Sequence, residues 1–123
     1  MAKIKITAGK VALEADLNNS PTAKKLLAAL PITGRANRWG DEIYFSIPVT
    51  DDQAPDARED VAVGEIAYWP PGSAFCIFWG PTPASTGKEP RAASPVNPLG
   101  KISGDAKAFA AVRSGEKVRI EKA

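Results

Sequence analysis

Hydrophobic and polar residues alternate along much of the chain, and this alternation predicts short antiparallel strands. Residues 3–7 and 11–16 each follow a strict period of two, with a turn at Ala8-Gly9 between them. We expect them to pair as a hairpin with one face in solvent. Residues 41–48 alternate in the same way, and their apolar face consists of Ile43, Phe45 and Ile47. These patterns indicate a mainly β fold.

The second half of the chain contains the most apolar segments. Residues 64–69 predict a strand that Pro70-Pro71-Gly72 ends by forcing a turn. Residues 74–79 are apolar on both faces, which is typical of a central strand. Shorter strands are predicted at residues 99–102 and 117–121, and residues 32–38 are predicted to be extended.

Two helices interrupt the predicted strands. Ser20 is a suitable N-cap and Pro21 suits the first helical position, after which alanine and leucine recur at helical spacing until Pro31. Asp105 can cap a second, short helix, which Gly115 stops. The chain therefore carries one main helix and one short helix.

Two longer segments, residues 49–60 and 80–98, are predicted to be surface loops. The first is acidic and the second contains five prolines. At 123 residues, we expect a single domain over residues 1–123. Seven or eight short strands favour a closed eight-stranded β-barrel, because closure removes exposed strand edges, and the two helices would then cover the barrel's ends.

Composition excludes several kinds of chemistry. The chain has no histidine and one cysteine. It therefore has no Ser-His-Asp triad, no Cys-His pair, no histidine zinc motif and no internal disulfide. We expect no metal and no cofactor. Cys76 lies among large apolar residues and is expected to be packed and unreactive, and neither Glu42 nor Glu65 has an obvious partner for acid–base catalysis.

Charge and hydropathy restrict the partners. No stretch approaches the length of about 20 apolar residues that a membrane span needs, and residues 1–7 lack the apolar core of a signal peptide. We therefore expect a cytoplasmic protein without a membrane partner. The net charge is +2 and the lysines are spread along the chain, so we expect no nucleic-acid partner.

Aromatic residues crowd into residues 39–79 and suggest a binding face. Alternation directs Phe45, Phe75, Ile77 and Trp79 inward and leaves Tyr44 and Phe78 on the opposite face. Trp69 lies on the side of its strand that carries Glu65 and Ala67. With Arg35 and Arg38 nearby, this outer face suits a peptide or planar ligand. In the alternative interpretation, the two long loops cover it.

Four segments resemble cyclophilins and their relatives. Gly72-Ser73-Ala74-Phe75-Cys76-Ile77 is similar to the G-S-Q-F-F-I strand of cyclophilins, and residues 99–102 are similar to their F-G-K-V segment. The motifs W-G-D-E-I-Y-F at residues 39–45 and Y-W-P-P-G at residues 68–72 look more like the small bacterial and archaeal cyclophilin-like family. This resemblance implies a cyclophilin-type barrel with a groove on its outer face.

The resemblance does not extend to the residues that form the prolyl isomerase groove of cyclophilins. Aligned on cyclophilins, Ala74 stands where a glutamine belongs, Cys76 where a phenylalanine belongs and Val96 where the histidine belongs, while Pro70 falls near the asparagine. Only the arginine has candidates, in Arg38 or Arg35.

Three functions are left open. The first is a peptide or small-ligand binding module whose pocket is formed by Arg38, Trp39, Glu42, Tyr44, Trp69 and Phe78. The second is a weak, atypical prolyl isomerase with Arg38 as the catalytic residue. The third is a subunit that docks on a larger enzyme.

Overall fold

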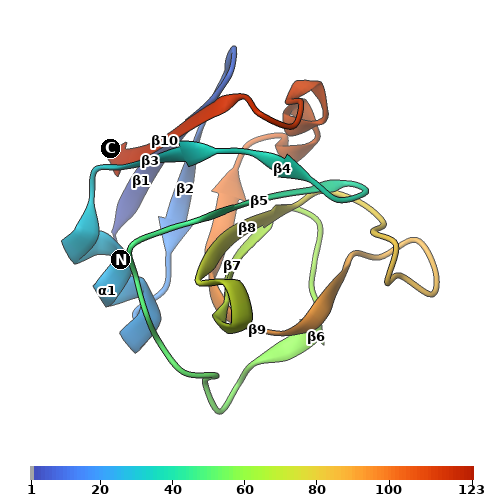
Figure 1. Ribbon diagram of the computed structural model, residues 1–123, viewed down its shortest axis with the longest axis horizontal. Helices are drawn as coiled ribbons and strands as arrows, with labels where there is room; N and C mark the ends of the chain where they lie inside the picture. The colour runs from blue at the N-terminus through green and yellow to red at the C-terminus, as the bar shows by residue number, and fades with distance from the viewer. Residues whose placement is uncertain (1) are drawn as a thin grey trace.

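The computed structural model describes residues 2–123, so Met1, with which the predicted domain begins, lies outside the described residues. The chain is mainly β, as predicted (Figure 1). Its strands are β1 (Lys3–Ala8), β2 (Val11–Leu17), β3 (Ile32–Arg35), β4 (Asn37–Arg38), β5 (Glu42–Ser46), β6 (Arg58–Asp60), β7 (Glu65–Trp69), β8 (Ala74–Phe78), β9 (Arg91–Ser103) and β10 (Lys117–Lys122). The helical segments are α1 (Pro21–Ala29) and the 3-10 helices η1 (Pro70–Gly72) and η2 (Ala106–Ala111).

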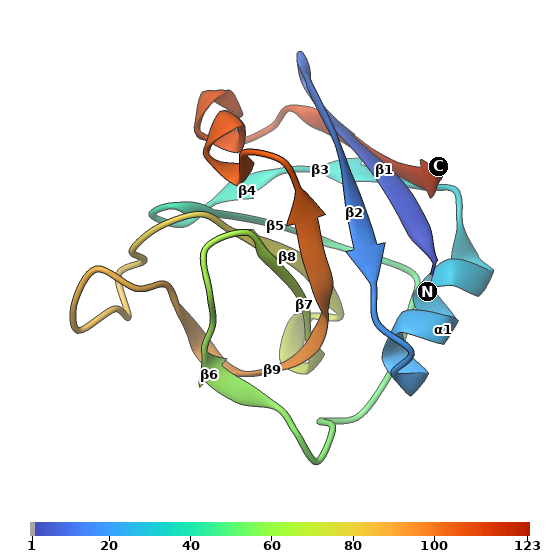
Figure 2. The ribbon, with the colours of Figure 1, turned by 180° about the vertical axis from the view of Figure 1, so that it is seen from behind.

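The strands form one strongly curved sheet, with the order β3-β10-β1-β2-β9-β7-β8-β5-β4 and with β6 paired to β9. Its two ends, β3 and β4, are consecutive in the chain and separated only by Ala36. Within residues 2–123 no hydrogen-bonded ladder joins β3 to β4. The closed eight-stranded barrel is therefore not confirmed. Instead the sheet has ten strands and wraps around the core until one chain segment forms both of its edges (Figure 2).

The inner face of this sheet encloses the main core. Ile4 and Ile6 of β1 point inward because alternate residues of a strand share one face. Leu26 of α1 and Phe109 of η2 pack on the same core from opposite sides of the fold (Figure 1). Complete burial of each such side chain contributes about 1.5–3 kcal/mol.

The two predicted helices, α1 and η2, begin where the sequence predicts. The Ser20 hydroxyl accepts a hydrogen bond from the Ala23 N–H at 3.2 Å, and Pro21 occupies the first turn of α1. The Asp105 carboxylate accepts from the Lys107 N–H at 3.0 Å and caps η2. The hairpin of β1 and β2 is also confirmed, although its two turn residues are Gly9 and Lys10 rather than Ala8 and Gly9.

The prediction of two long loops is wrong in part. Residues 58–60 form β6, and β9 begins at Arg91 and runs for 13 residues. Prolines are tolerated in β9 because the strand changes partners there, pairing with β6 at Val96 and with β7 from Asn97 onward. Register shifts between Arg91 and Val96 and between Pro98 and Gly100 leave room for residues that donate no backbone hydrogen bond.

These two misassigned segments create a second, smaller core on the outer face of the sheet. β6 and the first half of β9 lie over β7 and β8 and bury apolar side chains there. The cluster consists of Val61, Ala67, Ala74, Cys76, Phe78, Ala92 and Val96. β8 is therefore buried on both faces, which confirms its prediction as a central strand.

Candidate functional site

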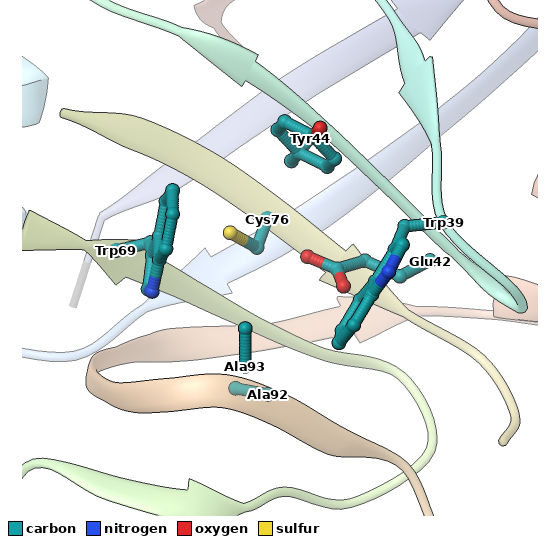
Figure 3. Close-up of a pocket in the computed structure, with 7 residues that line it drawn as sticks. All are labelled: Trp39, Glu42, Tyr44, Trp69, Cys76, Ala92 and Ala93. Carbon is teal, nitrogen blue, oxygen red and sulfur yellow. The ribbon is translucent and has the colours of Figure 1, made fainter. Parts of the chain in front are cut away.

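The second core stops short of covering the whole outer face and leaves a cavity of about 210 Å³. The cavity opens between the β4–β5 hairpin, β7, β8 and β9, and Figure 3 shows its walls. It is lined by Trp39, Glu42, Tyr44, Trp69, Cys76, Ala92 and Ala93. This face is therefore partly covered by the second core and partly open.

Trp39 forms one wall and stands in a tight turn. Its N–H donates to the Glu42 carbonyl at 3.0 Å, which closes the turn between β4 and β5. Gly40 has a φ of +63°, and a Cβ atom there would lie 2.8 Å from the Cα of Thr82. Glycine is therefore required both by the backbone conformation and by the loop packed against it. The W-G-D-E segment holds Trp39 beside Glu42.

Trp69 forms the opposite wall, across Glu42 and Cys76 in Figure 3. Its indole is held at two points. The Nε1–H donates to the Ser94 hydroxyl at 2.7 Å, and Gly72 lies against the six-membered ring. A Cβ atom at residue 72 would approach Cζ3 of Trp69 to 2.7 Å. The η1 turn of the Y-W-P-P-G motif therefore provides the space that the indole fills.

Glu42 of β5 and Cys76 of β8 form the floor, and Tyr44 of β5 stands at a third side. The side chains of all three project from the outer face of the sheet, and Tyr44 lies directly opposite Cys76 in the register of the two strands. Glu42 is only 4% exposed. Burial raises the pKa of its carboxyl to about 8, and the neighbouring Cys76 thiol offsets this only in part. Burial also raises the pKa of the Cys76 thiol.

Arg38, the predicted catalytic candidate, has its guanidinium outside the cavity. Its Nε–H donates to the Gly40 carbonyl at 2.7 Å, and Nη1 donates to the carbonyls of Ala110 and Val112 at 3.0 and 3.1 Å. The guanidinium also lies over the Trp79 ring. Arg38 thus joins the β4–β5 hairpin to η2, and no arginine or lysine among residues 2–123 lines the cavity.

The structure brings together four of the six predicted ligand-binding residues, namely Trp39, Glu42, Tyr44 and Trp69. Phe78 points to the same outer face as predicted but is fully buried in the second core. Arg38 lies elsewhere, as described above. Sequence reasoning missed Cys76, Ala92 and Ala93 as cavity residues. Alternation along β8 could have placed Cys76 on this face, but the two alanines lay in a segment predicted to be a loop.

The positions aligned with the cyclophilin groove are largely filled by apolar side chains. Val96, aligned with the histidine, is fully buried in the second core, and Ala74 lies in the same cluster. Only Cys76 of the aligned positions lines the cavity.

Glu65, the other glutamate considered for catalysis, forms a salt bridge with Arg58 and accepts a hydrogen bond from the Ala62 N–H at 2.9 Å.

Across residues 2–123, no group of three or more histidine, cysteine, aspartate or glutamate residues is arranged to hold a metal ion. None of the described helices has the length and apolar character that crossing a membrane requires.

Comparison with known proteins identifies the fold and the family of this chain. The family model described as Cyclophilin-like matches residues 2–121. The solution structure of a hypothetical protein from Archaeoglobus fulgidus is similar, with a TM-score of 0.86 and 38% sequence identity over 99% of this chain and 95% of that one. A search of curated proteins found no match. The resemblance seen in the sequence motifs is thus confirmed, and the chain belongs to the cyclophilin-like family.

Proposed function

We propose that this protein is a binding module that holds a small ligand in the cavity between Trp39 and Trp69. The observation that carries the proposal is the preformed shape of this cavity. Two indoles face each other across a floor that contains one buried carboxyl group (Figure 3). Ligand sites of proteins typically combine apolar and aromatic walls with a few well-placed polar groups, as this cavity does.

The size of the cavity limits the ligand. Its volume of about 210 Å³ lies below the range of about 300–1,000 Å³ that is usual for drug-sized ligands. A small organic molecule, or one side chain of a peptide, would fill it. The walls are held by contacts within the protein, such as that of Trp69 with Ser94. Binding therefore requires little ordering of the site, which favours affinity.

The site does not favour prolyl isomerisation by Arg38. An isomerase of that kind needs a cation near the twisting amide, to weaken its resonance and stabilise the transition state. The Arg38 guanidinium is engaged with three backbone carbonyls and with Trp79 instead. A binding function needs no such cation, so the arrangement around the cavity supports binding over catalysis.

A fragment screen by ligand-observed and protein-observed NMR tests the proposal. We expect some fragments to bind and to shift the signals of Trp39, Trp69 and Tyr44. Trp39→Ala removes one wall and should abolish binding, whereas Val63→Ala, at an exposed apolar residue outside the cavity, should leave it unchanged. Fragments that bind only elsewhere, or no binding at millimolar concentration, would overturn the proposal.

The same sample allows the isomerase alternative to be measured. Cis–trans exchange in a proline-containing peptide is followed by NMR with and without the protein. We expect no acceleration. An increased exchange rate that disappears in Arg38→Ala would instead support the isomerase function.

A further inference from the structure

Resting on the proposed ligand-binding function, we propose that the cavity recognises a small organic cation of the methylated ammonium class. Trp39, Trp69 and Tyr44 would surround its methyl groups, and the Glu42 carboxylate would face its charge. This defines the chemical class of the ligand and assigns Glu42 as the residue that determines specificity.

The aromatic walls are the first argument. The faces of tryptophan and tyrosine rings carry partial negative charge, and they attract alkylammonium ions within about 6 Å of the ring centre. The cavity has two tryptophans on opposite sides and a tyrosine at a third side (Figure 3). Ala92 and Ala93 of β9 close the remaining side with small side chains. This arrangement encloses a compact cation from several directions.

The second argument is the contrast between the two buried glutamates in the described part of the chain. Glu42 is 4% exposed and Glu65 is 6% exposed. Glu65 is satisfied by Arg58 and by the Ala62 N–H. Glu42 has no salt-bridge partner among residues 2–123 and only a weak thiol donor beside it. Because buried carboxylates are normally paired, a cationic ligand supplies what the protein itself does not.

The basic side chains on the strands around Glu42 pair with other carboxylates, so that a cationic ligand could pair with Glu42. Cys76 on β8 and Tyr44 on β5 are the other titratable groups that line the cavity. On β4 and the following turn, Arg38 pairs with Asp41 at 3.5 Å. On β9, Arg91 pairs with Glu59 and Asp60 of β6, at 3.5 and 3.2 Å. Together with the Arg58–Glu65 pair, these contacts neutralise the charges on the surrounding strands.

The protonation of Glu42 gives the inference a measurable signature. With its pKa near 8, the carboxyl of the empty site is mostly protonated at about pH 7 and mostly ionised at about pH 9. A cation favours the ionised form. Its affinity should therefore rise about tenfold between these pH values, and binding at the lower pH should release a proton.

Isothermal titration calorimetry with two probes tests the inference. One probe is choline, whose quaternary ammonium does not titrate. The other is the neutral alcohol in which a tert-butyl group replaces the trimethylammonium group of choline. At about pH 9 choline should bind at least about tenfold more tightly than the alcohol, a difference of the size that cation–π contacts and one charge pair produce. At about pH 7 the binding enthalpy of choline should depend on the buffer, because the buffer takes up the released proton.

Two variants locate the effect. Glu42→Gln resembles the protonated carboxyl in shape and should fold, but at about pH 9 it should bind choline more weakly than wild type and should show no pH dependence of this binding. Glu89→Gln changes an exposed glutamate outside the cavity and should behave as wild type. A trimethyl-lysine peptide serves as a further probe. Tighter binding of this peptide than of choline would identify a modified protein as the source of the ammonium group.

The outcomes separate this inference from the proposed function. Equal or tighter binding of the neutral alcohol, or choline binding that Glu42→Gln leaves unchanged, would overturn the ligand class. So would the absence of choline binding. Each of these results leaves the small-ligand function standing if fragments still bind the cavity in the NMR screen, and a failed screen overturns both.

Discussion

The guanidinium carbon of Arg38 lies 5.0 Å from the centre of the Trp79 ring, on the side of the fold where η2 covers the core. Trp79 itself is 3% exposed and packs against Phe109 of η2, with ring centres 6.5 Å apart. Arg38 therefore continues a stack that begins in the main core, and its hydrogen bonds to η2 hold that helix in place. This residue has a structural role that its sequence position beside Trp39 did not suggest.

Arg38→Ala should destabilise the fold by about 2 kcal/mol, because it removes three hydrogen bonds from a charged donor and one cation–π contact. Solvent already weakens these interactions in part, because the Arg38 side chain is partly exposed. Urea unfolding measures the loss. Arg35→Ala is the matched control, since Arg35 donates one exposed hydrogen bond, to the Gly115 carbonyl at 3.0 Å. The control should cost less than about 1 kcal/mol. An Arg38→Ala protein as stable as wild type would contradict the role assigned to the residue.

Gly72→Ala should displace the Trp69 indole, since the added Cβ would overlap its six-membered ring. We expect a shift in tryptophan fluorescence, weaker binding of any cavity ligand and a loss of about 1–3 kcal/mol from overpacking. Gly87→Ala is the control, because nothing lies within 4 Å of a Cβ atom at that position. Unchanged fluorescence and binding in Gly72→Ala would show that the glycine does not fix the ring.

The Glu42 carboxyl should make the stability of the protein depend on pH. Its pKa is about 8 when folded, against an ordinary value of 4.5, so the folded state binds more protons between these values. The contribution is fully present below the lower value and is lost as pH rises through the upper one, with a slope of at most about 1.4 kcal/mol per pH unit. Urea unfolding of wild type and Glu42→Gln across this range measures the difference, and parallel curves would rule out the raised pKa.

Cys76 should resist thiol reagents in the folded protein. Its side chain is buried and the pKa of its thiol is raised, so the reactive thiolate is scarce. Labelling with an aromatic disulfide at neutral pH should be slow in buffer and fast in denaturing urea. Rapid labelling of the native protein would mean that the floor of the cavity opens readily.

Several parts of the fold followed from local patterns. Alternation placed Phe45, Phe75, Ile77 and Trp79 in the inner core, where all four lie. The caps of both helices were also visible, because Ser20 and Asp105 act on the backbone within three residues of their own positions. Such features depend on neighbouring residues and need no knowledge of distant segments.

What the sequence did not reveal depends on distant pairing. β6 has only three residues, and β9 carries prolines that normally indicate a loop. Both become strands because each completes the other's hydrogen bonds, far apart in the chain. The same holds for Arg38, which lies beside Trp39 in sequence although its guanidinium binds carbonyls more than seventy positions away. The cavity residues Ala92 and Ala93 were missed for this reason.

The alternation of β5 and β8 has a consequence for how such proteins diversify. Ile43, Phe45, Phe75 and Ile77 face the main core, while Glu42, Tyr44 and Cys76 on the same strands face the cavity. A substitution at Glu42 or Tyr44 can therefore change the lining of the cavity without disturbing the main core. The lining of the cavity can thus change by point mutation, one outward position at a time, while the inner half of each strand is inherited intact.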